Sequence, residues 1–319
     1  MRRMELRSFV RYDEKYVKLD ISASTVCWSG SVRGGMGEVY KAEHQLLKRP
    51  CAIKLIRPEH AGNPKALARF EREVRTTAKL THPNTIAIYD YGRADDGTFY
   101  YVMEFLPGLN LAELLRKNGP LPPARTVHIL EQICGALAEA HTTALIHRDI
   151  KTSNIFITER GGVQDVAKLL DFGLVKVIDT ADSEETQLTQ LGSISGTPTY
   201  MSPEQAATDG VPGVPSDIYS LGAVAFRMLT GEAPFSGTSM EIMISHVRDK
   251  APSLRAINAD IPEELEAVVL KCLEKKPEDR YRSAHALREA LLTCQLSDTW
   301  TESDAATCLV AAIGRTSCH

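Results

Sequence analysis

The pattern of apolar and polar residues divides the chain into a strand-rich first part and a helical second part. In the first part, short alternating stretches bounded by turn residues predict strands, and one stretch with apolar side chains at helical spacing predicts a helix. The predicted strands are 38–40, 51–56, 85–91 and 98–105, and the predicted helix is 64–80. The first part is therefore expected to be mostly sheet.

After Pro107-Gly108 the apolar residues recur at helical spacing, and two short stretches between these segments predict strands. The predicted helices are 111–117, 124–141, 216–229, 239–247, 263–271 and 284–292, and the predicted strands are 155–158 and 168–170. The stretch 179–195 is rich in Ser, Thr and Gln and is the candidate for a mobile loop. A linker at 104–108 joins the two parts, and a cleft between two such parts is a usual place for a small ligand.

Composition narrows the class of protein. Apolar residues make up 43% and charged residues 24% of the 319 residues, which is typical of a soluble globular chain. Lys and Arg number 37 against 41 Asp and Glu, so the net charge of −4 gives no electrostatic reason to expect nucleic acid as a partner. No apolar run is long enough for a membrane helix, and no secretory leader is apparent. The seven cysteines are odd in number and lack zinc-binding spacing, which argues against a zinc ribbon and against a disulfide scaffold. We therefore expect a reducing, cytoplasmic location.

A glycine cluster, Gly34-Gly35-Met36-Gly37, stands at the tip of the first predicted hairpin. Alone it is equally consistent with an ordinary turn, but Lys54 on the next strand adds a cation that could meet phosphate oxygens beside the backbone N–H groups. A lysine in an apolar strand needs a partner, and Glu73 on the predicted helix is the candidate. The alternative is that Glu73 is one solvated charge among many on that helix.

The densest polar segment is Ile146-His147-Arg148-Asp149-Ile150-Lys151-Thr152-Ser153-Asn154, and Leu170-Asp171-Phe172-Gly173 follows a predicted hairpin. That hairpin can bring Asp149, Asn154 and Asp171 to one side. Two carboxylates and an amide oxygen are ligands suited to Mg²⁺ rather than to zinc. Asp149 can in addition accept a hydroxyl proton, next to the positive charge of Lys151.

Taken together, these motifs make the sequence resemble the protein kinases, specifically the eukaryotic-like Ser/Thr kinases of bacteria, from Arg33 to Leu292. The resemblance rests on RGGMGEVYKA, AIK, HRDIKTSN, DFG, GTPTYMSPEQ, SDIYSLG and PEDRYRSA, in this order. It implies an α+β, bilobal kinase fold with a small β-rich N-lobe and a larger, mostly helical C-lobe. The expected divisions are an N-terminal extension at 1–20, the N-lobe at 21–105, the C-lobe at 106–293 and a tail at 294–319 without assignable function.

The resemblance also assigns roles to single residues. It implies that Asp149 orients the acceptor hydroxyl and takes its proton, that Lys151 steadies the transferring phosphoryl group, and that Thr197 contacts the catalytic loop. Lys54 would hold the ATP phosphates and pair with Glu73. Asn154 and Asp171 would hold Mg²⁺, with Mn²⁺ as an alternative. The remaining nucleotide-binding residues implied by the resemblance are Val32, Arg33, Gly34, Gly35, Gly37, Val39, Ala52, Met103, Glu104 and Leu106.

Other residues with chemical potential are expected to be architectural. The resemblance implies that Glu204 and Arg280 form a buried ion pair and that Asp217 braces the catalytic loop through backbone donors. His141 and His147 are interpreted as structural hydrogen-bonding groups rather than bases.

One segment departs from the kinase pattern. Val32 stands at the position of the first glycine of the phosphate loop, and 22–31 lacks the alternation of a strand. We therefore expect weakened ATP binding. The alternative to an active Ser/Thr kinase is a catalytically weak or inactive kinase-fold scaffold. A small-molecule phosphotransferase is disfavoured by the complete activation segment.

Regulation and partners follow from the same resemblance. Arg148 and Lys176 would meet a phosphate on the 179–195 loop, and Thr189 is the leading phosphoacceptor, ahead of Thr186, Ser193 and Ser195. The expected partners are proteins that carry Ser or Thr, with transient self-association for autophosphorylation.

Overall fold

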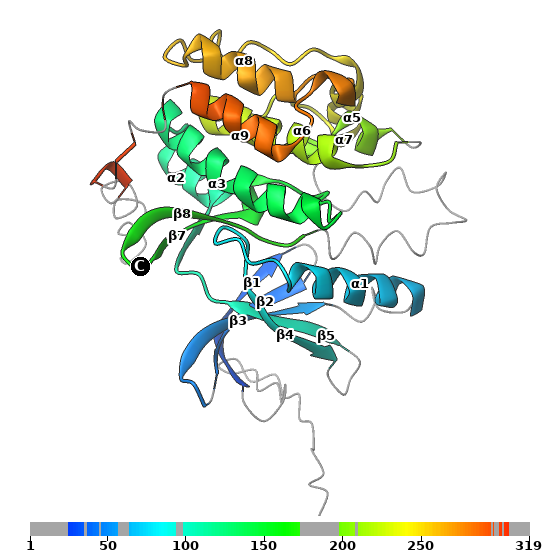
Figure 1. Ribbon diagram of the computed structural model, residues 1–319, viewed down its shortest axis with the longest axis vertical. Helices are drawn as coiled ribbons and strands as arrows, with labels where there is room; N and C mark the ends of the chain where they lie inside the picture. Colours follow the sequence, from blue (N-terminus) through cyan, green and yellow to red (C-terminus); the bar gives the residue numbers. More distant parts are fainter. Residues whose placement is uncertain are drawn as a thin grey trace, which may run out of the picture. The chain divides into compact units, whose positions relative to one another are not determined.

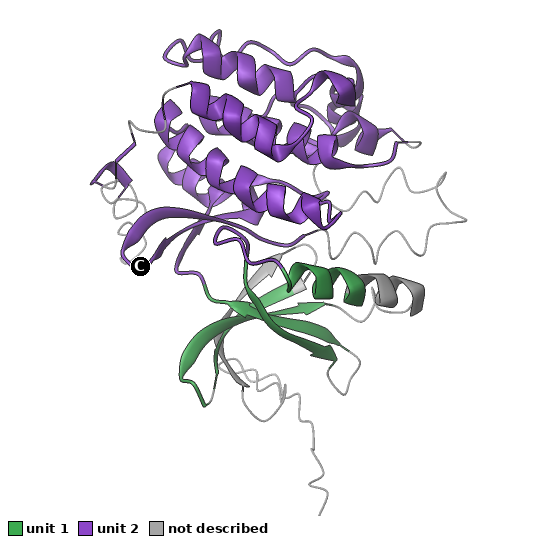
Figure 2. Ribbon diagram, viewed as in Figure 1, with its two compact units in different colours: residues 1–79, 86–105, 174–195 green, residues 80–85, 106–173, 196–319 purple. Residues whose placement is uncertain are grey.

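The chain forms two compact units (Figure 2). The first contains residues 1–79, 86–105 and 174–195, and the second contains 80–85, 106–173 and 196–319. The structure is a computed structural model that describes residues 25–34, 37–44, 46–56, 64–93, 98–172, 198–207, 210–294, 296, 300–301 and 303–305. The predicted extension at 1–20, Gly35, the loop at 179–195 and Thr197 lie outside the described residues.

The first unit is built on a five-stranded antiparallel sheet in the order β1-β2-β3-β5-β4 (Figure 1). Its elements are β1 (Thr25–Gly34), β2 (Gly37–His44), β3 (Arg49–Ile56), α1 (Pro64–Thr77), β4 (Ile88–Arg93) and β5 (Phe99–Glu104). One face of the sheet is covered by a hydrophobic cluster that includes Cys51 and Ile53 of β3 and Val102 of β5. Because side chains alternate along a strand, Ala52 and Lys54 lie on the opposite face.

The expectation that 22–31 would be a poor first strand was wrong for residues 25–31. They belong to β1, which pairs with β2 and shifts register between Cys27 and Ser31. Strand pairing uses backbone N–H and C=O groups, and a bulge can absorb an irregular side-chain pattern without ending the ladder. Val32 stands opposite Val39 in this ladder, so its backbone is extended and does not need the left-handed conformation that favours glycine.

The second unit is mainly helical (Figure 1). Its helices are α2 (Leu111–Asn118), α3 (Pro123–Thr142), α5 (Pro203–Ala206), α6 (Val214–Thr230), α7 (Ser239–Arg248), α8 (Glu263–Cys272) and α9 (Ala284–Thr293). A three-stranded sheet is formed by β6 (Gly108–Asn110), β7 (Ile155–Arg160) and β8 (Val163–Leu169). Short 3₁₀ turns cover Thr152–Asn154, Pro198–Tyr200 and Pro277–Asp279.

Helix α6 lies at the centre of the second unit's hydrophobic core. It packs against α3, α8 and α9, and most of its side chains are buried. Its first turn contains Asp217, and it ends at Gly231 with φ +82°, a left-handed conformation that glycine adopts without strain. The helix therefore places a buried carboxylate at a fixed position.

Most predicted elements agree with the observed ones to within a few residues. The main differences are that the strand predicted at 168–170 begins at Val163, that helix 64–80 ends at Thr77 and that strand 85–91 begins only at Ile88, with Thr85 making a single bridge to Leu169. The short elements β6 and α5 were not predicted. The expected α+β class, with a strand-rich first unit and a mainly helical second unit, is confirmed. Across the part of the chain that the structure describes, no helix combines the length and the apolar character needed to cross a bilayer.

Candidate active site

The segment between α3 and β7 brings three polar side chains of the second unit together. The Lys151 ammonium lies 2.8 Å from the Asp149 carboxylate. The Asn154 side-chain amide donates to the backbone carbonyl of Asp149 at 2.9 Å and to its carboxylate at 3.1 Å. The Asp149 carboxylate is thus held by two donors from its own loop, and its side chain is 17% exposed, so it remains accessible to a ligand.

The backbone of this loop is held by Asp217 of α6. The Asp217 carboxylate, 1% exposed, accepts from the backbone N–H of His147 at 2.8 Å and of Arg148 at 2.9 Å. It also contacts His141 Nε2 at 2.9 Å. Arg148 has φ +62°, which non-glycine residues seldom adopt, so the two backbone bonds hold a strained conformation. The predicted bracing role of Asp217 and the hydrogen-bonding role of His141 are confirmed.

His147 connects this loop with the segment that carries Asp171. Its Nε2 lies 2.8 Å from the carbonyl of Leu170, so Nε2 carries the hydrogen, and Nδ1 accepts from the backbone N–H of Asp149 at 3.2 Å. The ring also packs against Phe172 with centroids 4.7 Å apart. Burial lowers the pKa of His147 although the Asp217 carboxylate acts in the opposite direction. The His147 imidazole is neutral and both of its nitrogens are hydrogen-bonded, so its role is structural, as predicted.

The oxygen ligands predicted for a cation come from adjacent segments of the second unit. The Asn154 amide nitrogen is committed to Asp149, which leaves its amide oxygen as the atom suited to a cation. Asp171 follows β8 with φ +53°. Among the described residues no three His, Cys, Asp or Glu side chains form a metal cluster. One carboxylate and one amide fit Mg²⁺, which usually completes its shell with water and substrate phosphates.

The first unit carries the residues predicted to bind the nucleotide on one face of its sheet. Lys54 stands directly opposite Val39 on β2, and Ala52 directly opposite Met103 on β5. Directly paired residues share a face of an antiparallel sheet, so these four lie on the side away from the hydrophobic cluster. In backbone register Val32 continues this row on β1, and Gly34 and Gly37 form the last pair before the turn.

Two predicted contacts of the first unit stay predictions. Lys54 is 8% exposed, and its ammonium lies 5.9 Å from the centre of the Tyr101 ring, while Glu73 is half-buried on α1. The pairing of Lys54 with Glu73 stays a prediction. Glu104 is almost fully buried, and its carboxylate accepts from the backbone N–H of Ala87 at 3.0 Å, so any adenine contact must come from its backbone.

The segment 198–205 is joined to the catalytic loop by contacts that the sequence did not reveal. The Tyr200 hydroxyl lies 2.9 Å from that of Thr152, and the Gln205 amide donates to the Arg148 carbonyl at 2.8 Å. Thr152 stood in the recognised motif, but nothing in the sequence identified Tyr200 as its partner.

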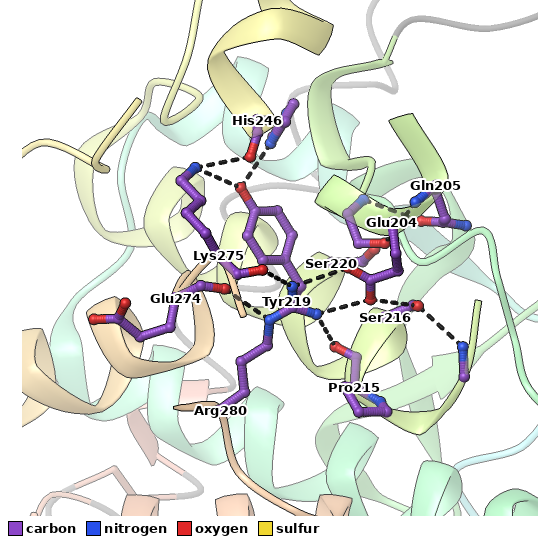
Figure 3. A network of polar contacts seen from close by, with 12 residues as sticks. Glu204, Gln205, Pro215, Ser216, Tyr219, Ser220, His246, Glu274, Lys275 and Arg280 are labelled. Atoms are coloured by element: carbon purple, nitrogen blue, oxygen red, sulfur yellow. Dashed lines mark hydrogen bonds and ion pairs between the residues drawn. The ribbon is translucent and has the colours of Figure 1, made fainter. Parts of the chain in front are cut away.

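Glu204 and Arg280 form the predicted ion pair (Figure 3). Two parallel bonds of 2.8 and 2.9 Å join the guanidinium to the carboxylate, and Ser216 donates to the same carboxylate at 2.6 Å. Burial alone would raise the pKa of Glu204, but the bonds from Arg280 and Ser216 outweigh it and the pKa is lowered. The ion pair therefore anchors the start of α5 to the loop after α8.

Comparison with known proteins agrees with this geometry. Residues 32–292 match the family model described as the protein kinase domain. The Ser/Thr-protein kinase PrkC of Bacillus subtilis is 38% identical over 270 residues, which is 84% of this chain and 40% of that protein. PknB of Mycobacterium leprae is 41% identical over 265 residues, 81% of this chain and 41% of the relative. The chain thus spans about two fifths of the length of these curated relatives.

A solved structure of the Mycobacterium tuberculosis PknI kinase domain, a double mutant, superposes with a TM-score of 0.66 at 25% identity, covering 85% of this chain and 95% of the other. The solved structure of Rad53 1–466 in complex with AMP-PNP superposes with a TM-score of 0.68 at 24% identity, and the match covers 83% of this chain and 64% of Rad53. This second likeness supports the fold alone. With a family model that matches most of its length, and with the catalytic loop arranged as described, the chain belongs to the protein kinase family.

Proposed function

We propose that this chain is a Ser/Thr protein kinase that transfers the γ-phosphoryl group of ATP to Ser and Thr hydroxyls of proteins. The observation that carries the proposal is the arrangement of Asp149, which Lys151 contacts at 2.8 Å and Asn154 at 3.1 Å. A carboxylate held in this way can take a hydroxyl proton without changing position. The relatives' names as Ser/Thr kinases support the choice of acceptor.

The reaction assigns one task to each of these side chains. The acceptor oxygen attacks the γ-phosphorus, the bond from that phosphorus to the β,γ-bridging oxygen breaks, and ADP leaves. The acceptor proton passes to the carboxylate of Asp149. Lys151 places positive charge where negative charge spreads over the transferring group. Because Lys151 also contacts Asp149, it keeps the carboxylate oriented toward the hydroxyl.

Nucleotide binding is assigned to residues of the first unit and cation binding to residues of the second. Lys54, with Glu73 as its proposed partner, would hold the α- and β-phosphates, and Val39, Ala52 and Met103 would contribute the apolar surface that receives the adenine. Asn154 and Asp171 would hold Mg²⁺ or Mn²⁺, which neutralises phosphate charge when bound. The chain contains every residue that the proposed assignment requires. This disfavours the alternative of an inactive scaffold.

Regulation by phosphorylation is part of the proposal. Thr189 would be the phosphoacceptor and Thr197 the contact to the catalytic loop. A phosphate adds about −1.5 to −2 charges and acceptor oxygens that Arg148 and Lys176 could bind. Transient contact between two copies would allow autophosphorylation. Mass spectrometry after incubation with ATP would locate the phosphate, and full activity of Thr189→Ala with no phosphate at 180–195 would disprove the switch.

The proposed location is a reducing compartment such as the cytoplasm, because buried cysteines of the chain are free thiols. Cys51, Cys134 and Cys272 are buried free thiols. Burial raises the pKa of Cys272 to about 12, so it remains protonated and unreactive.

The direct test is a phosphorylation assay with radiolabelled ATP, Mg²⁺ and myelin basic protein as acceptor. The wild-type chain should transfer label to Ser or Thr, and Asp171→Ala should lose transfer together with Mg²⁺-dependent nucleotide binding. Failure of the folded wild-type chain to label either the acceptor or itself would contradict the proposal.

A further inference from the structure

The segment Pro198–Tyr200 borders the catalytic loop on one side. The Tyr200 hydroxyl contacts Thr152, the residue after Lys151, and the Tyr200 carbonyl accepts from the Ser220 hydroxyl of α6 at 2.7 Å. An acceptor protein whose hydroxyl lies at Asp149 must extend over the surface beside this loop. The position of Pro198–Tyr200 therefore affects how the acceptor chain can approach.

The other side of this segment is held by His246 of α7. The His246 Nε2 atom lies 3.1 Å from the carbonyl of Thr199. A carbonyl can only accept, so Nε2 carries the ring hydrogen and Nδ1 is left as an acceptor. The Tyr219 hydroxyl lies 2.9 Å from Nδ1 and supplies the hydrogen. The tautomer of His246 is thus determined from both sides.

Lys275 is the first donor of this hydrogen-bonded chain (Figure 3). Its ammonium lies 3.4 Å from the Tyr219 oxygen, which accepts because its hydrogen is given to His246. The same ammonium donates to the carbonyls of His246 at 2.9 Å and Ser245 at 3.2 Å. Donation therefore runs from Lys275 through Tyr219 and His246 to the carbonyl of Thr199.

The surroundings of His246 keep its imidazole in one protonation state. His246 and Tyr219 are 0% exposed, and the Phe235 ring meets His246 edge to face at 5.0 Å. Burial, and then the positive charge of Lys275, lower the pKa of His246 to about 4. The imidazole is therefore neutral over the working pH range and remains a single donor to Thr199.

We infer that His246 is a positioning residue for the acceptor protein: by holding the carbonyl of Thr199 it fixes Pro198–Tyr200 beside the catalytic loop. The inference rests on the proposed kinase function. According to this inference, His246 affects the affinity for the acceptor protein and not the affinity for ATP. The reason is that His246 contacts neither Asp149 nor Lys151 and has no part in binding ATP.

Steady-state kinetics on purified variants of the full chain test the inference, with ATP, Mg²⁺ and myelin basic protein. His246→Ala should raise the KM for the acceptor about tenfold, the effect of one lost hydrogen bond, and change the KM for ATP less than about twofold. His246→Gln should recover most of the loss, since its amide can donate from nearly the same place as Nε2. Tyr219→Phe, which keeps the buried ring, should show an intermediate increase.

The matched control is His285→Gln, an exposed histidine of α9 whose side chain is 69% exposed, which should leave both KM values unchanged. Thermal unfolding identifies variants that fail to fold, and His246→Gln and Tyr219→Phe then carry the test. Unchanged acceptor KM in His246→Ala, or equal loss in Ala and Gln, would overturn the inference. Wild-type protein without any transfer would instead refute the proposed function, so the two failures are distinguishable.

Discussion

The Lys151 ammonium lies 2.8 Å from the Asp149 carboxylate, and the two side chains face the same space from a single loop. The pair is partly exposed, at 31% and 17%, which is what a site that must receive a substrate requires. In the architectural contact between Arg280 and Glu204, the guanidinium is fully buried and the carboxylate is 14% exposed. The exposure of the cation, 31% for Lys151 against 0% for Arg280, thus separates the proposed catalytic pair from the structural one.

Replacing Lys151 should lower turnover more than nucleotide affinity. Lys151→Ala removes positive charge near the transferring group, so kcat should fall on the order of 10²-fold while the KM for ATP stays nearly constant. Steady-state kinetics would measure both. Lys151→Arg retains charge but not the compact ammonium, so it should recover only part of kcat. An equal increase in the KM for ATP in both variants would indicate a binding role instead.

Replacing Asp217 should destabilise the catalytic loop. Asp217→Asn leaves one oxygen for the backbone N–H groups of His147 and Arg148 and turns an amide donor toward one of them. The free energy of unfolding should fall by about 2 kcal/mol, measured by urea denaturation. Asp260→Asn, at an exposed carboxylate, is the control and should change it by less than about 0.5 kcal/mol. Equal stability of the two variants would show that the loop does not depend on Asp217.

Trp300 should stabilise the second unit from the predicted tail. Its indole N–H donates to Asp165 at 3.1 Å, and its ring lies 5.4 Å from the Arg125 guanidinium, which forms a buried ion pair with Asp165. Trp300→Phe loses the hydrogen bond but keeps an aromatic ring, and should cost about 1 kcal/mol. Trp300→Ala also uncovers the ion pair and should cost about 3 kcal/mol. Urea denaturation measures both, and equal costs below about 0.5 kcal/mol would contradict the role of Trp300.

His246 should make the fold sensitive to acid. Its pKa of about 4 in the folded chain is below the ordinary 6.5, so between these values the unfolded chain binds more protons. Stability therefore decreases as the pH falls from 6.5 toward 4, by about 3 kcal/mol in full. His246→Gln should show a shallower decrease when urea denaturation is followed over this range. Buried His147, also with a lowered pKa, remains in both proteins and cancels in the difference. Parallel curves would contradict the assignment.

The sequence predicted those features that depend on local pattern. The spacing of HRDIKTSN placed Asp149, Lys151 and Asn154 on one loop, where the structure brings them into contact. Helical periodicity located α3, α6 and α9 to within a few residues, because apolar spacing follows directly from burial on one side.

Contacts across long stretches of sequence were harder to anticipate. β1 was doubted because its side chains do not alternate, yet its ladder needs only backbone groups. The tail was given no function, although Trp300 closes over the buried ion pair of Arg125 and Asp165. His246 lies within the predicted helix 239–247, and nothing in the sequence assigned it a role. Its chemistry arises only from the carbonyl of Thr199 and the hydroxyl of Tyr219, which folding brings to it.

Asp149→Asn tests the central claim most directly. The substitution keeps shape and removes the proton acceptor, while Asn154 and Asp171, the proposed cation ligands, are unchanged. Phosphoryl transfer to myelin basic protein and binding of a fluorescent ATP analogue with Mg²⁺ should be measured on the same preparation. We expect transfer to fall by at least about 10²-fold with nearly unchanged nucleotide affinity. Near wild-type transfer by the folded variant would contradict the role of Asp149 and the mechanism built on it.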